Sequence, residues 1–147
     1  QQNILRSSIT SDYDFATLLD VLEHIPRDAV CKFMTEVAHA IVPGGYLIIT
    51  VPHTNSALIS KHYQHFDSNK LLKLLSPDFE DIQFTPFDYL SYQFRIIQRL
   101  AGGSGKYFII THHSLSTAIF KYYMKKCLYG SGEKKCKKIA CLARKRE

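Results

Sequence analysis

An apolar run at 46–51, placed directly after the Pro-Gly-Gly sequence at 43–45, constrains the fold of this chain more than any other feature. Proline and glycine end a preceding helix, and the residues that follow them are nearly all apolar at both odd and even positions. A strand that exposes neither face to water has this pattern, because alternation disappears when both faces are buried. The run therefore predicts a central strand of a parallel sheet.

The segment before this run has the period of a helix. Its apolar residues recur at spacings of three and four, namely Val30, Phe33, Met34, Val37 and Ile41. Pro26 and Asp28 are residues typical of a first helical turn, so we expect the helix to begin there. Upstream, 15–19 is an apolar run of strand length. A strand, a helix and a strand joined by short connections predict a βαβ unit with parallel strands.

Downstream, the sequence predicts a short helix and two further strands. Asp67 or Ser68 is expected to cap the helix. Its leucines are expected on the buried side, namely Leu71, Leu72, Leu74 and Leu75. Ile82 and Phe84 alternate with polar residues, which predicts a half-exposed strand. The segment 138–143 is expected to pair antiparallel with that strand.

Two predicted helices, 89–100 and 116–128, are rich in tyrosine and phenylalanine, and the sequence AGGSGK separates them. AGGSGK does not fit a phosphate-binding loop. The pattern GxxxxGK[ST] requires a serine or threonine where Tyr107 stands. We therefore expect a flexible tether between the two helices.

The charge of the chain is unevenly distributed. The net charge is +6, but the segment 121–147 holds ten Lys or Arg and two Glu, so it carries +8 and the remainder carries −2. Such a basic segment attracts phosphate backbones or another anionic surface. Lysines also protect a solvated edge strand from pairing with other chains. Because no aromatic RNA-binding motif accompanies the charge, we favour the edge strand.

The length of 147 residues and the hydrophobic content of 46% suit one domain with its own core. No apolar run approaches the roughly 20 residues of a membrane-spanning helix, and no signal peptide opens the sequence. The four cysteines show no CxxC or zinc-ribbon spacing, which is typical of reduced thiols inside cells. We therefore expect a cytoplasmic protein. Because the sequence begins with Gln1, we also expect a processed product or a piece of a longer chain.

Several motifs follow one another in a characteristic order. Asp14 precedes the predicted strand at 15–19, a Leu-Glu-His sequence follows at 22–24, and Pro-Gly-Gly at 43–45 leads into the apolar run. The sequence HYQHFDSNKLLKLL comes next at 62–75. In this order the motifs resemble the later half of a class I S-adenosylmethionine-dependent methyltransferase. The resemblance implies an α/β, partial Rossmann-like methyltransferase fold, in which parallel strands are followed by a C-terminal antiparallel strand pair and interrupted by a helical insertion.

The resemblance also implies an activity and a site. It implies methyl transfer from S-adenosylmethionine to an acceptor, with a small molecule favoured over a nucleic acid. Leu19 and Asp20 would line the methionine portion of the cofactor, and His53 and Asn55 would lie near the substrate. The aromatic-rich insertion, 87–132, would act as a substrate cap on a single domain whose core is 3–86 and 137–145.

One departure from the family is large. The family binds its cofactor on a glycine-rich loop after its first strand, and no such loop precedes Asp14. We therefore expect these residues alone to bind S-adenosylmethionine poorly and to be inactive as an isolated piece. If 3–9 corresponds to the family's third strand, the strand at 15–19 has an exposed edge that suits a protein partner. The alternative function is a non-catalytic remnant that binds protein or RNA.

A metal site is a further hypothesis. Asp20, Glu23 and His24 have the spacing i, i+3 and i+4, which would place them on one side of a helical turn. His62 and His65 follow the next strand and have the spacing i, i+3. In this hypothesis, Asp20, Glu23, His24 and His65 would hold a divalent metal such as Mg²⁺ or Mn²⁺. The alternative is that Glu23 and His24 are scaffold residues bonded to the backbone or to solvent.

Overall fold

The computed structural model describes residues 13–89, 91–101, 112–130 and 132–147. The predicted strand at 3–9 and the tether after Ala101 lie outside these residues. The chain divides into two compact units, one formed by the residues up to Thr85 together with Lys138–Glu147, and one formed by Pro86–Lys137. The prediction of a single interrupted domain remains a prediction.

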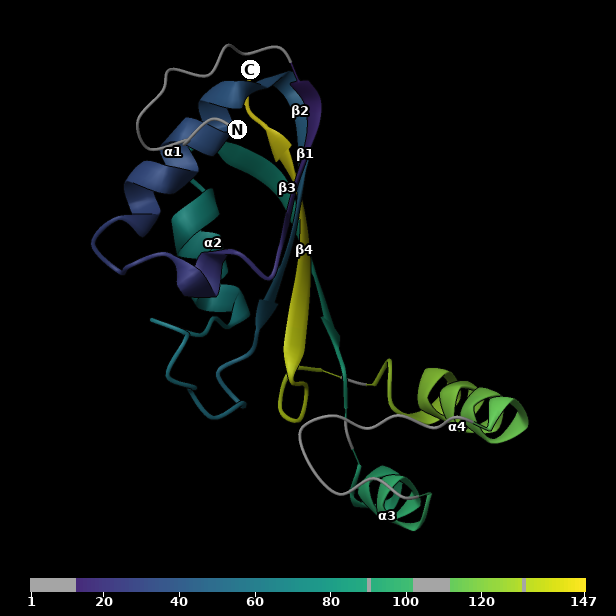
Figure 1. Cartoon of the computed structure of the whole chain (residues 1–147). Helices are drawn as coiled ribbons and strands as arrows, with labels where there is room; N and C mark the ends of the chain where they lie inside the picture. The colour runs from purple at the N-terminus through teal and green to yellow at the C-terminus, as the bar shows by residue number, and fades with distance from the viewer. Residues whose placement is uncertain (1–12, 90, 102–111, 131) are drawn as a thin grey trace. The chain divides into compact units, whose positions relative to one another are not determined.

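The first unit is built around a four-stranded sheet. Its elements are β1 (Tyr13–Leu19), the 3₁₀ turn η1 (Leu22–His24), α1 (Val30–Ala40), β2 (Ile41–Pro52), α2 (Ser68–Leu75), β3 (Phe79–Phe87) and β4 (Lys138–Lys145). The strand order is β1-β2-β4-β3, with β1 parallel to β2 and β2 antiparallel to β4. Figure 1 shows α1 and α2 on the same face of this sheet. The predicted α/β class, with parallel strands followed by an antiparallel C-terminal strand, is confirmed.

Helix α1 packs the predicted apolar stripe into the core. All five stripe residues are buried, although Ile41 belongs to β2 rather than to the helix, and Met34 and Val37 are no more than 3% exposed. The expected start of the helix was wrong, because the chain first forms a turn in which the Ala29 amide donates to the Pro26 carbonyl at 3.0 Å. Asp28 lies in this turn, and the N-cap is Ala29, which makes no side-chain cap bond. Burial of the stripe, rather than a cap, therefore fixes this helix.

Among the described residues, helices cover only one face of strand β2, which corrects the expectation of two covered faces. Leu47, Ile49 and Val51 are fully buried beneath the helices, whereas Tyr46 is 45% exposed on the opposite face. In the described part of the first unit, both long helices lie on the same side of the sheet, so alternate β2 side chains are left partly open. An apolar run at both parities therefore does not by itself prove burial of both faces.

Pro-Gly-Gly lies inside β2 rather than between the helix and the strand. Helix α1 ends at Ala40 and β2 begins at Ile41, while the register with β1 shifts between the pairs Tyr13↔Ile41 and Phe15↔Tyr46. Gly45 sits in this irregular stretch, where a Cβ atom would lie 2.8 Å from the Asp14 carbonyl oxygen of β1. The glycine therefore allows the two parallel strands to approach each other.

Strand β4 is an inner strand, which corrects the expectation of a lysine-protected edge. The Arg146 amide donates to the Asp78 carbonyl and the Lys137 amide to that of Phe87, so β4 runs antiparallel to β3. Much of its positive charge is paired with acidic residues. Arg144 forms ion pairs with both Glu80 and Asp81. The Lys145 ammonium lies 3.7 Å from a carboxylate oxygen of Asp78. The Arg146 guanidinium lies 3.6 Å from a carboxylate oxygen of Glu80. This part of the basic segment is therefore not an unpaired patch.

The second unit contains the predicted pair of aromatic-rich helices, α3 (Tyr92–Leu100) and α4 (His113–Lys126). They meet through Phe94, whose ring stacks on that of Tyr122 with centroids 6.3 Å apart. Burial, together with nearby Asp88, raises the pKa of Tyr123 to about 12. None of the described helices has both the length and the apolar character needed to cross a bilayer. The four cysteines are thiols rather than disulfides, and only Cys31 is exposed.

Candidate functional site

The parallel strands β1 and β2 end at the same rim of the sheet. Leu19 pairs with Thr50 in the register, and the Asp20 amide donates to the Thr50 carbonyl at 2.9 Å. The chain leaves β1 through Asp20 and leaves β2 through His53, so both connections start at one end of the sheet. In open α/β sheets, ligands bind beyond the carboxyl ends of the parallel strands. This rim is therefore where a ligand site is expected.

Asp20 is held at the rim by two side chains. The Lys138 ammonium lies 2.5 Å from Oδ2, and the Thr50 hydroxyl donates to Oδ1 at 3.5 Å. Asp20 has a φ of 53°, a left-handed conformation that aspartate tolerates better than most residues. It therefore lies outside the η1 turn, and the predicted helical grouping of Asp20 with Glu23 and His24 was wrong. Leu19, beside it, is 59% exposed.

His53 is buried, and it organises the turn after β2. Its Nδ1 atom accepts a hydrogen bond from the Asn55 amide at 3.0 Å. The segment around Phe66 runs parallel to this turn, because the Thr54 amide donates to the Phe66 carbonyl and the Phe66 amide to that of Pro52. His53 and Asn55 therefore lie together, as expected for residues on one short turn.

A cavity of about 520 Å³ opens beside this turn. Its lining residues are Arg27, Thr54, Ser56, Leu58, Gln64, His65 and Lys70. The lining includes neither the predicted cofactor residues, Leu19 and Asp20, nor the predicted substrate residues, His53 and Asn55. Arg27 and Lys70 give the cavity two positive charges, and no sequence motif indicated either residue. Only the folded path of the loop between β2 and α2 brings them together, since they lie 43 positions apart in the sequence.

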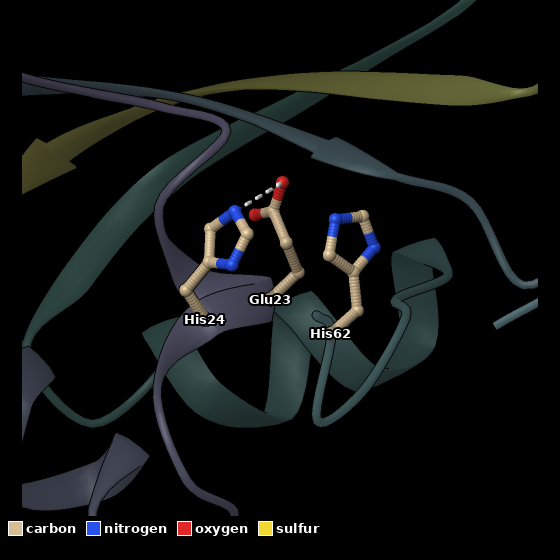
Figure 2. A group of neighbouring side chains, drawn as sticks. All are labelled: Glu23, His24 and His62. Carbon is tan, nitrogen blue, oxygen red and sulfur yellow. Dashed lines mark ion pairs between the residues drawn. The ribbon is translucent and has the colours of Figure 1, made fainter. Parts of the chain in front are cut away.

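Three side chains gather beside η1, namely Glu23, His24 and His62 (Figure 2). Each offers a ligand atom, and these atoms all lie within 4.8 Å of one another. The His24 Nε2 atom is 4.0 Å from Glu23 Oε1. Glu23 is only 1% exposed, whereas the side chain of His24 is 47% exposed. The group therefore has a buried acidic end and an open end.

His65 lies behind this group rather than in it. Its Nε2 atom is 2.8 Å from Nδ1 of His62, and its Nδ1 atom is 3.1 Å from the Ser56 carbonyl oxygen. Both ring nitrogens of His65 are thus occupied. Loss of hydration by burial lowers the pKa of His62, and the negative charge of Glu23 opposes this effect.

Comparisons with known proteins bear on the fold. No protein-family model matches the sequence, and no curated protein matches it. Solved structures do match. A SAM-dependent methyltransferase from Archaeoglobus fulgidus has a TM-score of 0.61 and 13% identity, over 98% of this chain and 66% of that chain. A possible histamine N-methyltransferase from Thermotoga maritima has a TM-score of 0.60 and 12% identity, over 99% and 62%.

The N-methyltransferase NodS from Bradyrhizobium japonicum, in complex with S-adenosyl-L-homocysteine, has a TM-score of 0.57 and 10% identity, over 99% of this chain and 53% of that chain. Identities this low show the fold alone. The chain has the fold of a portion of class I S-adenosylmethionine-dependent methyltransferases, and it spans about half to two thirds of the length of these three structures.

Proposed function

We propose that the protein containing this chain, whose fold is that of S-adenosylmethionine-dependent methyltransferases, transfers a methyl group from S-adenosylmethionine to a small-molecule acceptor. The observation that supports this most directly is the shared rim, where the pairing of β1 with β2 ends at Leu19 and Thr50. Similarity of nearly the whole chain to such enzymes supports it further. The sulfonium of the cofactor is already activated, so the protein contributes chiefly by positioning the two reactants.

In this proposal, Leu19 and Asp20 contact the methionine portion of the cofactor. The exposed Leu19 side chain supplies apolar contact, and the Asp20 carboxylate accepts a hydrogen bond from the cofactor's ammonium group. Lys138 and Thr50 hold that carboxylate at the end of the strand. The matched region is only part of the related structures, and the proposal assigns the rest of the cofactor site to residues outside this chain.

We assign the acceptor to the cavity beside the turn after β2. Thr54 and Ser56 offer hydrogen-bonding groups, and His53 positions them by holding the Asn55 amide. The positive charges of Arg27 and Lys70 favour an acceptor that carries a carboxylate or a phosphate. The aromatic helical unit, Pro86–Lys137, is proposed to act as a cap that selects the acceptor.

The cofactor assignment is tested by binding. We expect Asp20→Ala in the full-length protein to weaken S-adenosylmethionine binding by about 10-fold or more, since a hydrogen bond to a charged group contributes about 1.5–3 kcal/mol. Asp28→Ala, in the turn before α1, is the matched control and should leave binding unchanged. Isothermal titration gives both affinities, and a thermal melt shows whether each variant is folded.

Absence of S-adenosylmethionine binding to the full-length protein would overturn the proposed function. Equal affinities of the folded wild-type protein and the Asp20→Ala variant would overturn the role of Asp20. Residues 1–147 alone are expected to bind the cofactor poorly, and low-micromolar binding to them would contradict the proposal that residues elsewhere complete the site.

A second candidate function is association with another protein through the edge of β1. Tyr13, Phe15 and Leu19 are each about half exposed, at 56%, 49% and 59%. Among the described residues, no strand pairs with the outer edge of β1. An exposed apolar edge is a site for strand addition.

If this edge binds a partner or a second copy, Phe15→Glu should abolish the association seen by analytical ultracentrifugation or by co-purification. Leu72→Glu, which changes an exposed leucine on α2, should not. Methyl transfer by a protein whose assembly is unaffected by Phe15→Glu would exclude this candidate.

A further inference from the structure

Hydrogen bonds to the backbone determine which nitrogen of His24 carries a proton. Nδ1 of His24 lies 3.0 Å from the Lys61 carbonyl oxygen. A carbonyl oxygen only accepts, so Nδ1 must be the donor. In the neutral ring, Nε2 then carries a lone pair, and it is this atom that lies beside the Glu23 carboxylate. His24 therefore presents an acceptor to Glu23.

The hydrogen bonds of His65 determine in the same way which nitrogen of His62 carries a proton. Nδ1 of His65 donates to the Ser56 carbonyl at 3.1 Å, so Nε2 of His65 is an acceptor. That atom faces Nδ1 of His62 at 2.8 Å, and Nδ1 of His62 must therefore donate. The remaining nitrogen, Nε2 of His62, carries a lone pair. Figure 2 shows one ring nitrogen of His62 turned toward the Glu23 carboxylate.

Glu23 completes a group made only of acceptors. Its Oε2 atom is buried and receives no hydrogen bond from any described residue. A buried carboxylate oxygen without a donor is unfavourable, and two imidazole lone pairs close to it add to the cost. The three ligand atoms lie within 4.8 Å of one another. A cation between them would satisfy all three at once.

We propose that Glu23, His24 and His62 bind one divalent transition-metal ion of the Zn²⁺ type, and that His65 orients His62. Two imidazole nitrogens and one carboxylate are a common three-residue set for zinc, whereas Mg²⁺ prefers oxygen ligands. The donor set thus favours zinc-like ions over the Mg²⁺ or Mn²⁺ expected from the sequence. Asp20 is not a ligand in this proposal, because it is not among the residues whose ligand atoms lie within 4.8 Å of one another.

The backbone holds the two ligand-bearing segments together. The Tyr63 amide donates to the Glu23 carbonyl at 2.8 Å, and the Gln64 side chain donates to the Ile25 carbonyl at 3.3 Å. Arg27 Nε donates to the Tyr63 carbonyl at 3.1 Å. These contacts keep His62 opposite Glu23 without help from a metal, so the site is largely preorganised.

The ligand atoms would have to move only slightly to reach the spacing of a tetrahedral zinc site. Ligand atoms of a tetrahedral zinc site lie about 3.4 Å apart, given bonds of about 2.1 Å. His24 Nε2 and Glu23 Oε1 are 4.0 Å apart, and the half-exposed His24 ring has room to close that gap. Because the outer end of the group is open to solvent, a fourth position remains for water or an anionic ligand. His65 has the role of an outer partner that fixes the tautomer of a ligating histidine.

The test is a titration of the chelator-treated protein with Co²⁺ and with Zn²⁺. Co²⁺ bound to this set should produce the visible absorption of a four-coordinate site, saturating at one equivalent, and Zn²⁺ should displace it while excess Mg²⁺ should not. Zn²⁺ should also raise the thermal unfolding midpoint. Glu23→Gln keeps the shape of the side chain but removes its charge, and it should weaken Co²⁺ binding more than about 100-fold.

His65→Gln should weaken Co²⁺ binding by about 10–100-fold, as expected for an orienting residue. His39→Gln, on the exposed side of α1, is the control and should bind like the wild-type protein. Absence of a saturable Co²⁺ spectrum in the wild-type protein would overturn the proposal and leave a shared proton as the cation in this group. The wild-type titration needs no variant to fold, and it is independent of S-adenosylmethionine binding.

Discussion

Replacing Leu71 with alanine is expected to lower the free energy of unfolding by about 2–5 kcal/mol, the usual cost of removing a buried leucine side chain. Leu71 is 0% exposed and belongs to the core between α2 and the sheet. Truncation leaves a cavity that the packed neighbours fill only in part. Urea denaturation followed by circular dichroism measures the change.

The adjacent residue is a matched control. Leu72 is 44% exposed, so Leu72→Ala removes the same atoms from a position that water already reaches. Its effect should stay below about 1 kcal/mol. If both variants lost the same stability, the orientation of α2 on the sheet would be wrong.

Replacing Gly45 with alanine is expected to destabilise the first unit by about 2–3 kcal/mol. The new Cβ atom would lie 2.6 Å from a methyl carbon of Ile41 and 2.8 Å from the Asp14 carbonyl oxygen. The Asp14 oxygen belongs to the backbone of β1, so relief requires β1 and β2 to separate. The rim at Leu19 and Thr50 depends on the same pairing. Thermal and chemical denaturation measure the loss.

Gly44→Ala is the control for Gly45→Ala. Its φ of +78° makes alanine strained there, but nothing lies within 4 Å of the added Cβ atom. Gly44→Ala should therefore cost only the backbone strain, about 1 kcal/mol. A larger loss for Gly44→Ala than for Gly45→Ala would contradict the close approach of β1 to Gly45.

Local pattern predicted most of the secondary structure, for reasons that these leucines and glycines illustrate. The period of the apolar residues identified α1. Of the two caps expected for α2, Asp67 and Ser68, the structure has Asp67, which accepts from the Lys70 amide at 2.9 Å. The same pattern wrongly predicted that Leu72 is buried, because a run of leucines does not show which of two neighbouring residues faces the sheet. Likewise, the composition of β2 could not show that helices cover one face only.

The candidate metal group shows where sequence spacing reaches its limit. Glu23 and His24 were identified because they are neighbours on one short turn. Asp20 was wrongly included, because the left-handed residue at the end of β1 turns the chain before η1 begins. His62 was noted but not chosen over His65, since the choice depends on two carbonyl groups, those of Lys61 and Ser56, that accept from the histidine rings.

The sequence by itself determined the elements and their order, because periodicity, caps and glycine breaks act within a few residues of one another. It also determined the resemblance to a methyltransferase fold, which the solved structures support. Only the tertiary structure decided which strands are neighbours and which face of β2 is buried. It also decided which histidine faces Glu23. These features depend on contacts between residues far apart in the sequence, such as His24 with Lys61 (37 positions) and Ile48 with Leu142 (94 positions), and on backbone groups whose direction no local pattern encodes.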